Sequence, residues 1–212
     1  MTLGEREQDA IRAVLDGLER EVDVKLELGP TATPVTLLAA GGREIDSNAV
    51  ARDIVEAVCA LSDRVSLSII EHDEPGPWPR TTIGTGLEYL GMPAGYELTT
   101  LVHGILAAGR AAPGLGDASL ERLAAIDRDV AIDVYVTPTW PHCPPAVLLA
   151  YKLALASPRV TARGIEASEF AVEADRHGVH AVPAIVVDDR YAWAGAVPEA
   201  VFVERVLAAA AG

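Results

Sequence analysis

The stretch VYVTPTWPHCPPAVLLAYKLA, residues 134–154, decides the fold. It opens with apolar and β-branched residues, continues through a proline-bounded turn, and ends in a long apolar run rich in alanine and leucine. This order predicts a strand, a tight turn and a helix. Cys143 lies where the helix begins, and Trp140 occupies the first position of what would otherwise be a C-x-x-C motif.

The composition indicates a folded protein and restricts its partners. Half of the 212 residues are apolar and 23% are charged, which is typical of a globular chain. The net charge of −14 argues against nucleic acid or an anionic membrane as a partner, because both attract basic surfaces. Since no apolar run approaches ~18 residues and the first ten residues are polar, we expect no membrane span or signal peptide, and a cytoplasmic location.

The chain has two cysteines, Cys59 and Cys143, which are too few for a disulfide framework. No C-x-x-C pair is present, so the sequence predicts neither a structural zinc site nor another metal or cofactor. Cys59 lies within the apolar helical segment IVEAVCALS, and we expect it to be an ordinary core residue.

An internal repeat predicts two domains. In each half a proline precedes a short hairpin, a glycine follows it, and an amphipathic helix closes the unit: Pro79 matches Pro183, and Gly91 matches Gly195. The Gly-, Pro- and Ala-rich residues 109–117 are the best linker candidate. The predicted fold is therefore α/β, with two similar domains at residues 1–110 and 111–212, each a mixed central sheet flanked by helices; the alternative is a single doubly wound domain.

The family resemblance rests on TPTWPHCPPAV and, about forty residues later, HAVPAIVV. A strand, a C-x-x-C-like turn at a helix start and a later proline resemble the thioredoxin superfamily, in which that proline is cis; Pro183 matches it. The tandem arrangement is similar to the two-domain protein disulfide oxidoreductases, or glutaredoxin-like proteins. It is also similar to the N-terminal module of the alkyl hydroperoxide reductase flavoprotein subunit, and the resemblance covers nearly the whole chain.

The sequence departs from this family in both halves. A gapless alignment places residues 35–40, in a predicted strand at 34–40, opposite residues 132–137, and it places residues 43–46 opposite the C-x-x-C position. Those four residues include no thiol: Arg43, Glu44, Ile45 and Asp46. The link HDEPGPWP in the first half is also too short for the helix that SEFAVEADRHG supplies in the second.

In the second half the surviving Cys143 is the resolving cysteine, and the attacking position is Trp140. The helix dipole and a protonated His142 would favour the thiolate of Cys143, but no resolving partner is nearby. Cys143 is either a packed relic or a site for mixed-disulfide or glutathione chemistry. Trp140 is a binding platform, a plug that fills the lost active site, or a single-base change from a cysteine codon.

The other polar residues carry weaker signals. Asp133 lies one strand upstream of Trp140; it is either a relic of the family's proton-transfer acid or a solvent-facing residue on an alternating strand, which we favour. The remaining carboxylates show no pattern beyond solvated helix faces. A metal site formed by His142, His180 and Cys143 is conceivable, but loop or cap roles are more common.

These observations favour a thioredoxin-like protein that has lost its dithiol site and acts as a non-redox binding or chaperone-like accessory module. Its groove would use Trp140, Pro141, His142, Val182 and Pro183 to hold an extended segment of another protein. The alternative is a thiol–disulfide oxidoreductase that works through Cys143 alone, with glutathione as a possible partner, or an inactive variant of one. A third hypothesis is that the tandem sheet serves to dimerise or to dock to a flavoprotein.

Overall fold

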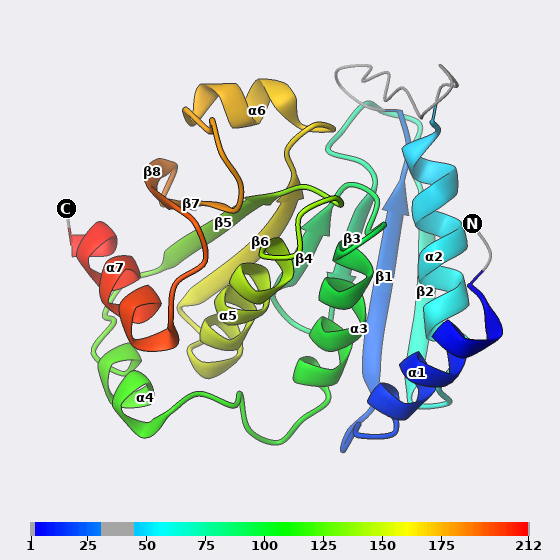
Figure 1. Ribbon diagram of the computed structural model, residues 1–212, viewed down its shortest axis with the longest axis horizontal. Helices are drawn as coiled ribbons and strands as arrows, with labels where there is room; N and C mark the ends of the chain where they lie inside the picture. The colour runs from blue at the N-terminus through cyan, green and yellow to red at the C-terminus, as the bar shows by residue number, and fades with distance from the viewer. Residues whose placement is uncertain (1–2, 31–44, 212) are drawn as a thin grey trace.

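The computed structural model describes residues 3–30 and 45–211, and it arranges them as two similar halves around one sheet (Figure 1). The strand order is β2-β1-β3-β4-β6-β5-β7-β8. Strands β1 to β4 come from the first half and β5 to β8 from the second. The halves join where β4 pairs in parallel with β6, from Leu87 opposite Ala162 to Leu90 opposite Ile165.

The first half contains three helices and four strands in the described residues. In chain order they are α1 (Glu5–Leu15), β1 (Val22–Leu28), α2 (Ser47–Cys59), β2 (Val65–Glu71), β3 (Arg80–Ile83), β4 (Leu87–Leu90) and α3 (Glu97–Ala108). The second half repeats this order and adds one helix. Its elements are α4 (Asp117–Leu123), β5 (Val130–Val136), α5 (Cys143–Ala156), β6 (Val160–Glu166), α6 (Ala171–Arg176), β7 (Ala184–Val187), β8 (Arg190–Ala194) and α7 (Glu199–Ala211).

The internal repeat is visible in the backbone. Pro79 and Pro183 both follow cis peptide bonds, and both carbonyls accept a hydrogen bond from the glycine that ends the following hairpin. The distance is 2.9 Å from Gly91 N to Pro79 O and 2.7 Å from Gly195 N to Pro183 O. The matched prolines and glycines of the sequence therefore occupy equivalent places. The expected boundary at residue 110 lies between α3 and α4.

The gapless alignment of the two halves is wrong. When only neighbours from the same half are counted, β1 in the first half and β5 in the second are the strands with a parallel neighbour on one side and an antiparallel neighbour on the other, so β1 is the counterpart of β5. Residues 29–46 separate β1 from its helix, whereas only residues 137–142 separate β5 from its helix. The strand expected at 34–40 lies outside the described residues, as do Arg43 and Glu44.

The main core lies on one face of the sheet. Alternate residues of β1 and β5, such as Leu26 and Val134, pack there with buried residues of α2, α3, α5 and α7. A second, smaller core contains Tyr135, Val186 and Ala174, which places α6 on the opposite face. In the first half the short link at residues 72–79 contains no helix, as expected, so among the described helices only α6 packs on this second face.

Candidate functional site

The predicted site lies where β5 ends. Tyr135 of β5 pairs with Ala184, the first residue of β7. Because the two strands are antiparallel, Pro183 and Val182, which precede β7, lie next to the end of β5, where the turn that carries Trp140 begins. Val182 is partly exposed and Ala181 is exposed, and both precede the first ladder pair of β7. The backbone before Pro183 is thus outside the sheet ladder and faces the same corner as the turn. We call residues 137–143 and 180–183 the Pro183 corner.

The turn residues of this corner are accessible. The Trp140 side chain is 47% exposed, and its ring meets the His142 ring edge-on at 5.4 Å between centroids. Pro141 and His142 are exposed as well. Tyr96, from the first half, is 49% exposed and its N–H donates to Pro138 O at 2.9 Å. The backbone of the first half therefore contacts the turn of the Pro183 corner.

Cys143 lies beneath the turn and not in it. The residue is 0% exposed, and its N–H donates to Trp140 O at 3.2 Å. Burial raises the pKa of the thiol to about 11, against a hydrogen bond with the Thr137 backbone that lowers it, and the carboxyls of Glu97 and Glu166 raise it further. The thiolate that attacks disulfides is therefore scarce at neutral pH. Cys59 is buried too, as expected, and burial raises its pKa to about 12.

Asp133 is not solvent-facing, and that expectation was wrong. It is 4% exposed and accepts two hydrogen bonds from the Arg163 guanidinium, at 2.7 and 2.5 Å. Its neighbours Ile132 and Val134 point into the main core with Cys143, so Asp133 points to the opposite face of the sheet. An ion pair with Arg163 across the β5–β6 ladder, and not proximity to the thiol, explains this residue.

The acids nearest the thiol come from elsewhere. Glu97, at the start of α3, is 0% exposed; its Oε2 accepts from the Thr100 hydroxyl at 2.6 Å. Burial raises its pKa to about 7. Glu166, at the end of β6, is 1% exposed, and burial raises its pKa as well. The expectation that the carboxylates lie on solvated helix faces is therefore wrong for these two residues.

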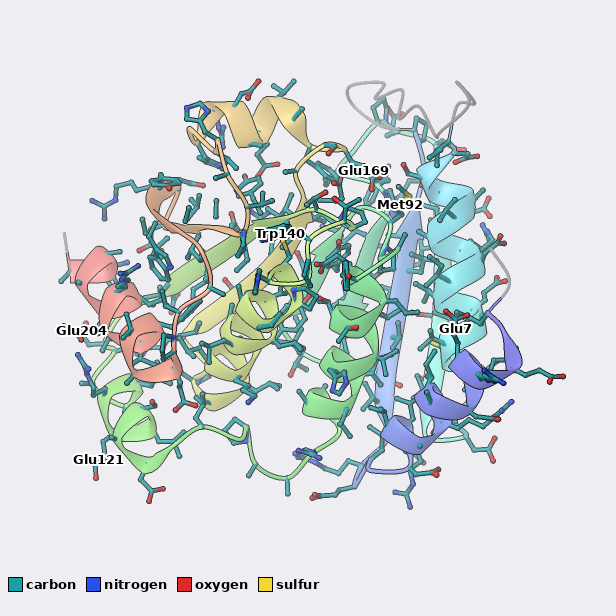
Figure 2. The ribbon with its side chains drawn as sticks, in the orientation of Figure 1. Glu7, Met92, Glu121, Trp140, Glu169 and Glu204 are labelled. Carbon is teal, nitrogen blue, oxygen red and sulfur yellow. The ribbon has the colours of Figure 1, made fainter. Side chains whose placement is uncertain are left out.

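Glu169 completes this carboxyl cluster of Glu97, Glu166 and Glu169. Its Oε1 accepts from Met92 N at 2.8 Å, and its own N–H donates to Glu166 Oε2 at 2.6 Å. Burial raises the pKa of Glu169 to about 7. Figure 2 shows Met92 and Glu169 close together, with Trp140 on the same upper part of the molecule. The sequence analysis did not predict this cluster. The position of Glu97 just after the loop GMPAGY was the only signal for it, and that position does not show whether the side chain is buried.

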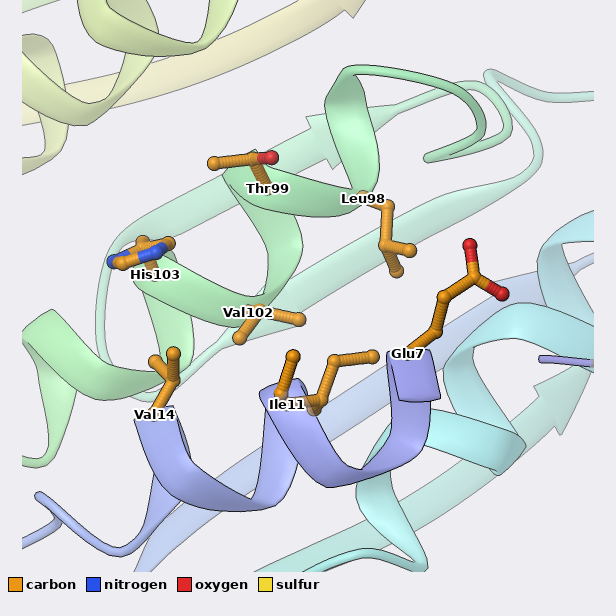
Figure 3. Close-up of a pocket in the computed structure, with 8 residues that line it drawn as sticks. Glu7, Ile11, Val14, Leu98, Thr99, Val102 and His103 are labelled. Carbon is orange, nitrogen blue, oxygen red and sulfur yellow. The ribbon is translucent and has the colours of Figure 1, made fainter. Parts of the chain in front are cut away.

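One hollow on the surface lies away from the Pro183 corner. A groove of about 220 Å³ lies between α1 and α3 and is mostly apolar, with Glu7 and His103 as its ionisable residues (Figure 3). Within residues 3–30 and 45–211, no group of three or more His, Cys, Asp or Glu side chains could hold a metal ion. No helix of the described chain is long and apolar enough to cross a membrane.

The fold and the corner define a tandem thioredoxin-fold protein with two isolated cysteines and no C-x-x-C pair. Residues 130–208 match the family model described as thioredoxin domain. The chain is similar to a protein disulfide oxidoreductase from Aeropyrum pernix K1, with a TM-score of 0.86 and 24% identity over 100% of this chain and 95% of that one.

Similarity extends to the alkyl hydroperoxide reductase AhpF. The N-terminal domain of the Enterococcus faecalis protein gives a TM-score of 0.82 at 18% identity, covering 97% of this chain and 100% of that one. The Escherichia coli protein is 26% identical over 178 residues, which are 80% of this chain and 33% of that protein. The chain spans about a third of the length of the curated relatives it matches, among them an NADH dehydrogenase of Bacillus subtilis.

Proposed function

We propose that this protein holds an extended segment of a partner protein at the Pro183 corner and does not exchange dithiols there. One observation carries the proposal: the attacking position holds an exposed tryptophan, while the remaining thiol is fully buried with a raised pKa. A thiol–disulfide oxidoreductase needs the reverse, which is an accessible thiolate at the helix start.

The binding mode follows from the backbone at the corner. Ala181 and Val182 precede the ladder of β7, so an extended peptide can pair with their main-chain groups in the manner of an added strand. The exposed Trp140 ring, in the turn that follows β5, offers apolar area and an indole donor, and the Tyr96 N–H of the first half donates to Pro138 O in the same turn. The backbone contact that the first half makes with the turn would explain why this half is retained without a C-x-x-C motif.

Binding is tested by titrating the protein with a panel of fluorescein-labelled, unstructured peptides and measuring fluorescence anisotropy. We expect micromolar affinity for apolar extended peptides and a loss of at least roughly tenfold in Trp140→Ala, because buried aromatic anchors dominate such interfaces. Tyr191→Ala is the matched control, since Tyr191 is also 47% exposed but lies on β8. Equal affinities in both variants, or no binding by any peptide, would contradict the proposal.

The redox alternative is tested separately by insulin reduction with dithiothreitol as the electron source. We expect no activity above background in the parent and in Cys143→Ser, and activity in Trp140→Cys, in which residues 140 and 143 can form the disulfide that the reductant reopens. Activity in the parent that disappears in Cys143→Ser would favour an oxidoreductase acting through Cys143 alone. The same assay with a glutathione mixed disulfide extends the test to glutathione as the partner.

A further inference from the structure

Tyr135 contacts both ends of one short segment of the Pro183 corner. Its backbone pairs with Ala184, the residue that follows Pro183. Its side chain lies in the second core, where the hydroxyl is hydrogen-bonded to His177 Nδ1 at 2.7 Å. Residues 178–183 lie between these two contacts, so a single residue of β5 fixes both ends of the segment. We call the contacts of Tyr135 with His177 and Ala184 the Tyr135 clamp.

The side-chain contact of the clamp is buried. Tyr135 and His177 are both shielded from solvent, and their rings lie 5.8 Å apart between centroids at an angle of 59°. The hydroxyl is also hydrogen-bonded to the carboxyl of Glu173, which lies on α6. A buried polar group that loses its partner costs more free energy than the hydrogen bond itself contributed. The contact therefore fixes the C-terminal end of α6 on the sheet.

The end of α6 directs the chain back toward the corner. His177 is the C-cap residue, and Gly178 follows it with φ 70°. The Val179 N–H donates to Ala174 O at 3.0 Å, which is the long hydrogen bond of a Schellman motif. This motif ends a helix with one defined path for the next residues. The position of His177 therefore sets where the chain enters residues 180–183.

The segment between the two contacts has little support of its own. Val179 and Val182 pack partly against the second core, whereas His180 and Ala181 are exposed. Within the described parts of the chain, the main-chain groups of residues 180–182 form no hydrogen bond. These groups are therefore available to an extended peptide, and their position depends on the two ends of the segment.

We propose that Tyr135 and His177 are positioning residues of the Pro183 corner, whose contact holds the main chain of residues 180–182 where a peptide can pair with it. Both side chains are buried, so they act through the segment and do not touch the peptide. Their role in binding rests on the proposed function. The order of the segment does not, and it can be measured directly.

The test is amide hydrogen exchange of Gly178 and Val179 in the parent and in Tyr135→Phe, which removes the hydroxyl but keeps the ring. We expect the protection of both amides to fall by roughly 5- to 100-fold, because the buried imidazole loses its partner and the segment opens more often. Unchanged protection in this variant would overturn the proposal.

The matched control is Tyr151→Phe. Tyr151 is also fully buried, and its hydroxyl donates to Glu88 O at 2.7 Å, but it lies on α5 and binds β4 of the first half. We expect the protection of Gly178 and Val179 to change by less than roughly twofold in this variant. An equal fall in both variants would show that the amides report general stability, and it would overturn the proposal.

Variants of His177 separate the hydrogen bond from packing. His177→Asn keeps a side-chain donor and acceptor near the position of Nδ1 and should stay within roughly threefold of the parent, whereas His177→Leu should lose as much protection as Tyr135→Phe. The losses in Tyr135→Phe and His177→Leu should not add in the double variant, because both remove the same contact. Additive losses would contradict the proposal. If Tyr135→Phe does not fold, the comparison of His177→Leu with His177→Asn decides.

The peptide titration reads the role in binding. Tyr135→Phe should weaken the binding of apolar extended peptides by at least roughly threefold, since a loosened segment must be ordered on binding, and Tyr151→Phe should not. Equal affinities in the parent and in Tyr135→Phe, with protection lost, would overturn the positioning role. If no peptide binds the parent, the proposed function fails, and the exchange experiment alone decides whether the clamp holds the segment.

Discussion

The two cis-proline corners of this protein have the same backbone and opposite surfaces. In the second half Val182 precedes Pro183, and the neighbouring Trp140 is exposed. In the first half Trp78 precedes Pro79 and is only 8% exposed. One corner presents its aromatic residue to solvent, while the other buries it.

Both faces of the Trp78 ring are contacted by residues of the first half. Its ring stacks on His72 at 4.1 Å between centroids with an angle of 2° between the planes, and the Arg80 guanidinium lies 5.1 Å from its centroid. Its Nε1 donates to Glu74 O at 3.2 Å. Gly29, at the end of β1, leaves the space that the indole fills. The first corner is thus filled by an aromatic residue of its own half, whereas Trp140 at the second corner is exposed.

The largest expected difference between the corners is in stability. We expect Trp78→Ala to lower the free energy of unfolding by about 3–5 kcal/mol, because it removes a large buried side chain. Trp140→Ala should change it by less than about 1 kcal/mol, since that ring is half exposed. Urea unfolding of both variants measures this, and equal losses would show that the two tryptophans do not differ in burial.

The second largest expected difference is the loss of stability when the glycine that ends each hairpin is replaced by alanine. Gly91 has φ 102°, and an added Cβ would lie 2.7 Å from the Cβ of Glu166. Gly195 has φ 91°, but an added Cβ meets nothing within 4 Å. We expect Gly91→Ala to cost about 2–4 kcal/mol and Gly195→Ala about 1–2 kcal/mol. Thermal or urea unfolding measures both losses, and a larger loss for Gly195→Ala than for Gly91→Ala would contradict the prediction.

Glu27 of β1 and the residue at the equivalent position of β5 differ in charge. Burial raises the pKa of Glu27, but hydrogen bonds and charges from Arg80 and Lys25 outweigh it and lower the pKa to about 2. The equivalent position of β5 is held by Tyr135, which is neutral, and its hydroxyl is hydrogen-bonded to His177 Nδ1 at 2.7 Å. Glu27 therefore contributes stability that is present above pH 4.5 and lost as the pH falls through 2.

We expect Glu27→Gln to lower the free energy of unfolding by about 1–3 kcal/mol at pH 7 and to have little effect near pH 2. Unfolding of parent and variant across this range measures it, with Glu204→Gln as the control for net charge. A loss of stability that is the same at both pH values would contradict the ionic explanation.

The smallest expected effect belongs to the junction between the halves. Because burial raises the pKa of Glu97 to about 7, its contribution to stability is present below pH 4.5 and lost as the pH rises through 7. Glu97→Gln should therefore stabilise the protein by about 1 kcal/mol at pH 8 and have no stabilising effect at pH 4. A variant that is less stable than the parent at pH 8 would contradict this prediction and indicate a donor to Oε1, in addition to the Thr100 hydroxyl that donates to Oε2.

The sequence by itself determined the repeat and the corner. Pro79, Pro183, Gly91 and Gly195 could be matched because backbone geometry restricts these positions to few residue types. The sequence also predicted that a helix begins at Cys143 and that no thiol occupies the attacking position, because both features are contained in one short stretch of sequence. That Pro183 lies near this turn in the fold was predicted from the family resemblance.

Only the tertiary structure decided which polar groups are buried. Asp133 is read as surface in an alternating strand, but its orientation depends on Arg163 of the adjacent strand. Glu97, Glu166 and Glu169 come from segments separated by about seventy residues, and they meet because β4 pairs with β6. Burial, and the pKa shifts that follow from it, depend on that pairing, and local sequence patterns do not contain it.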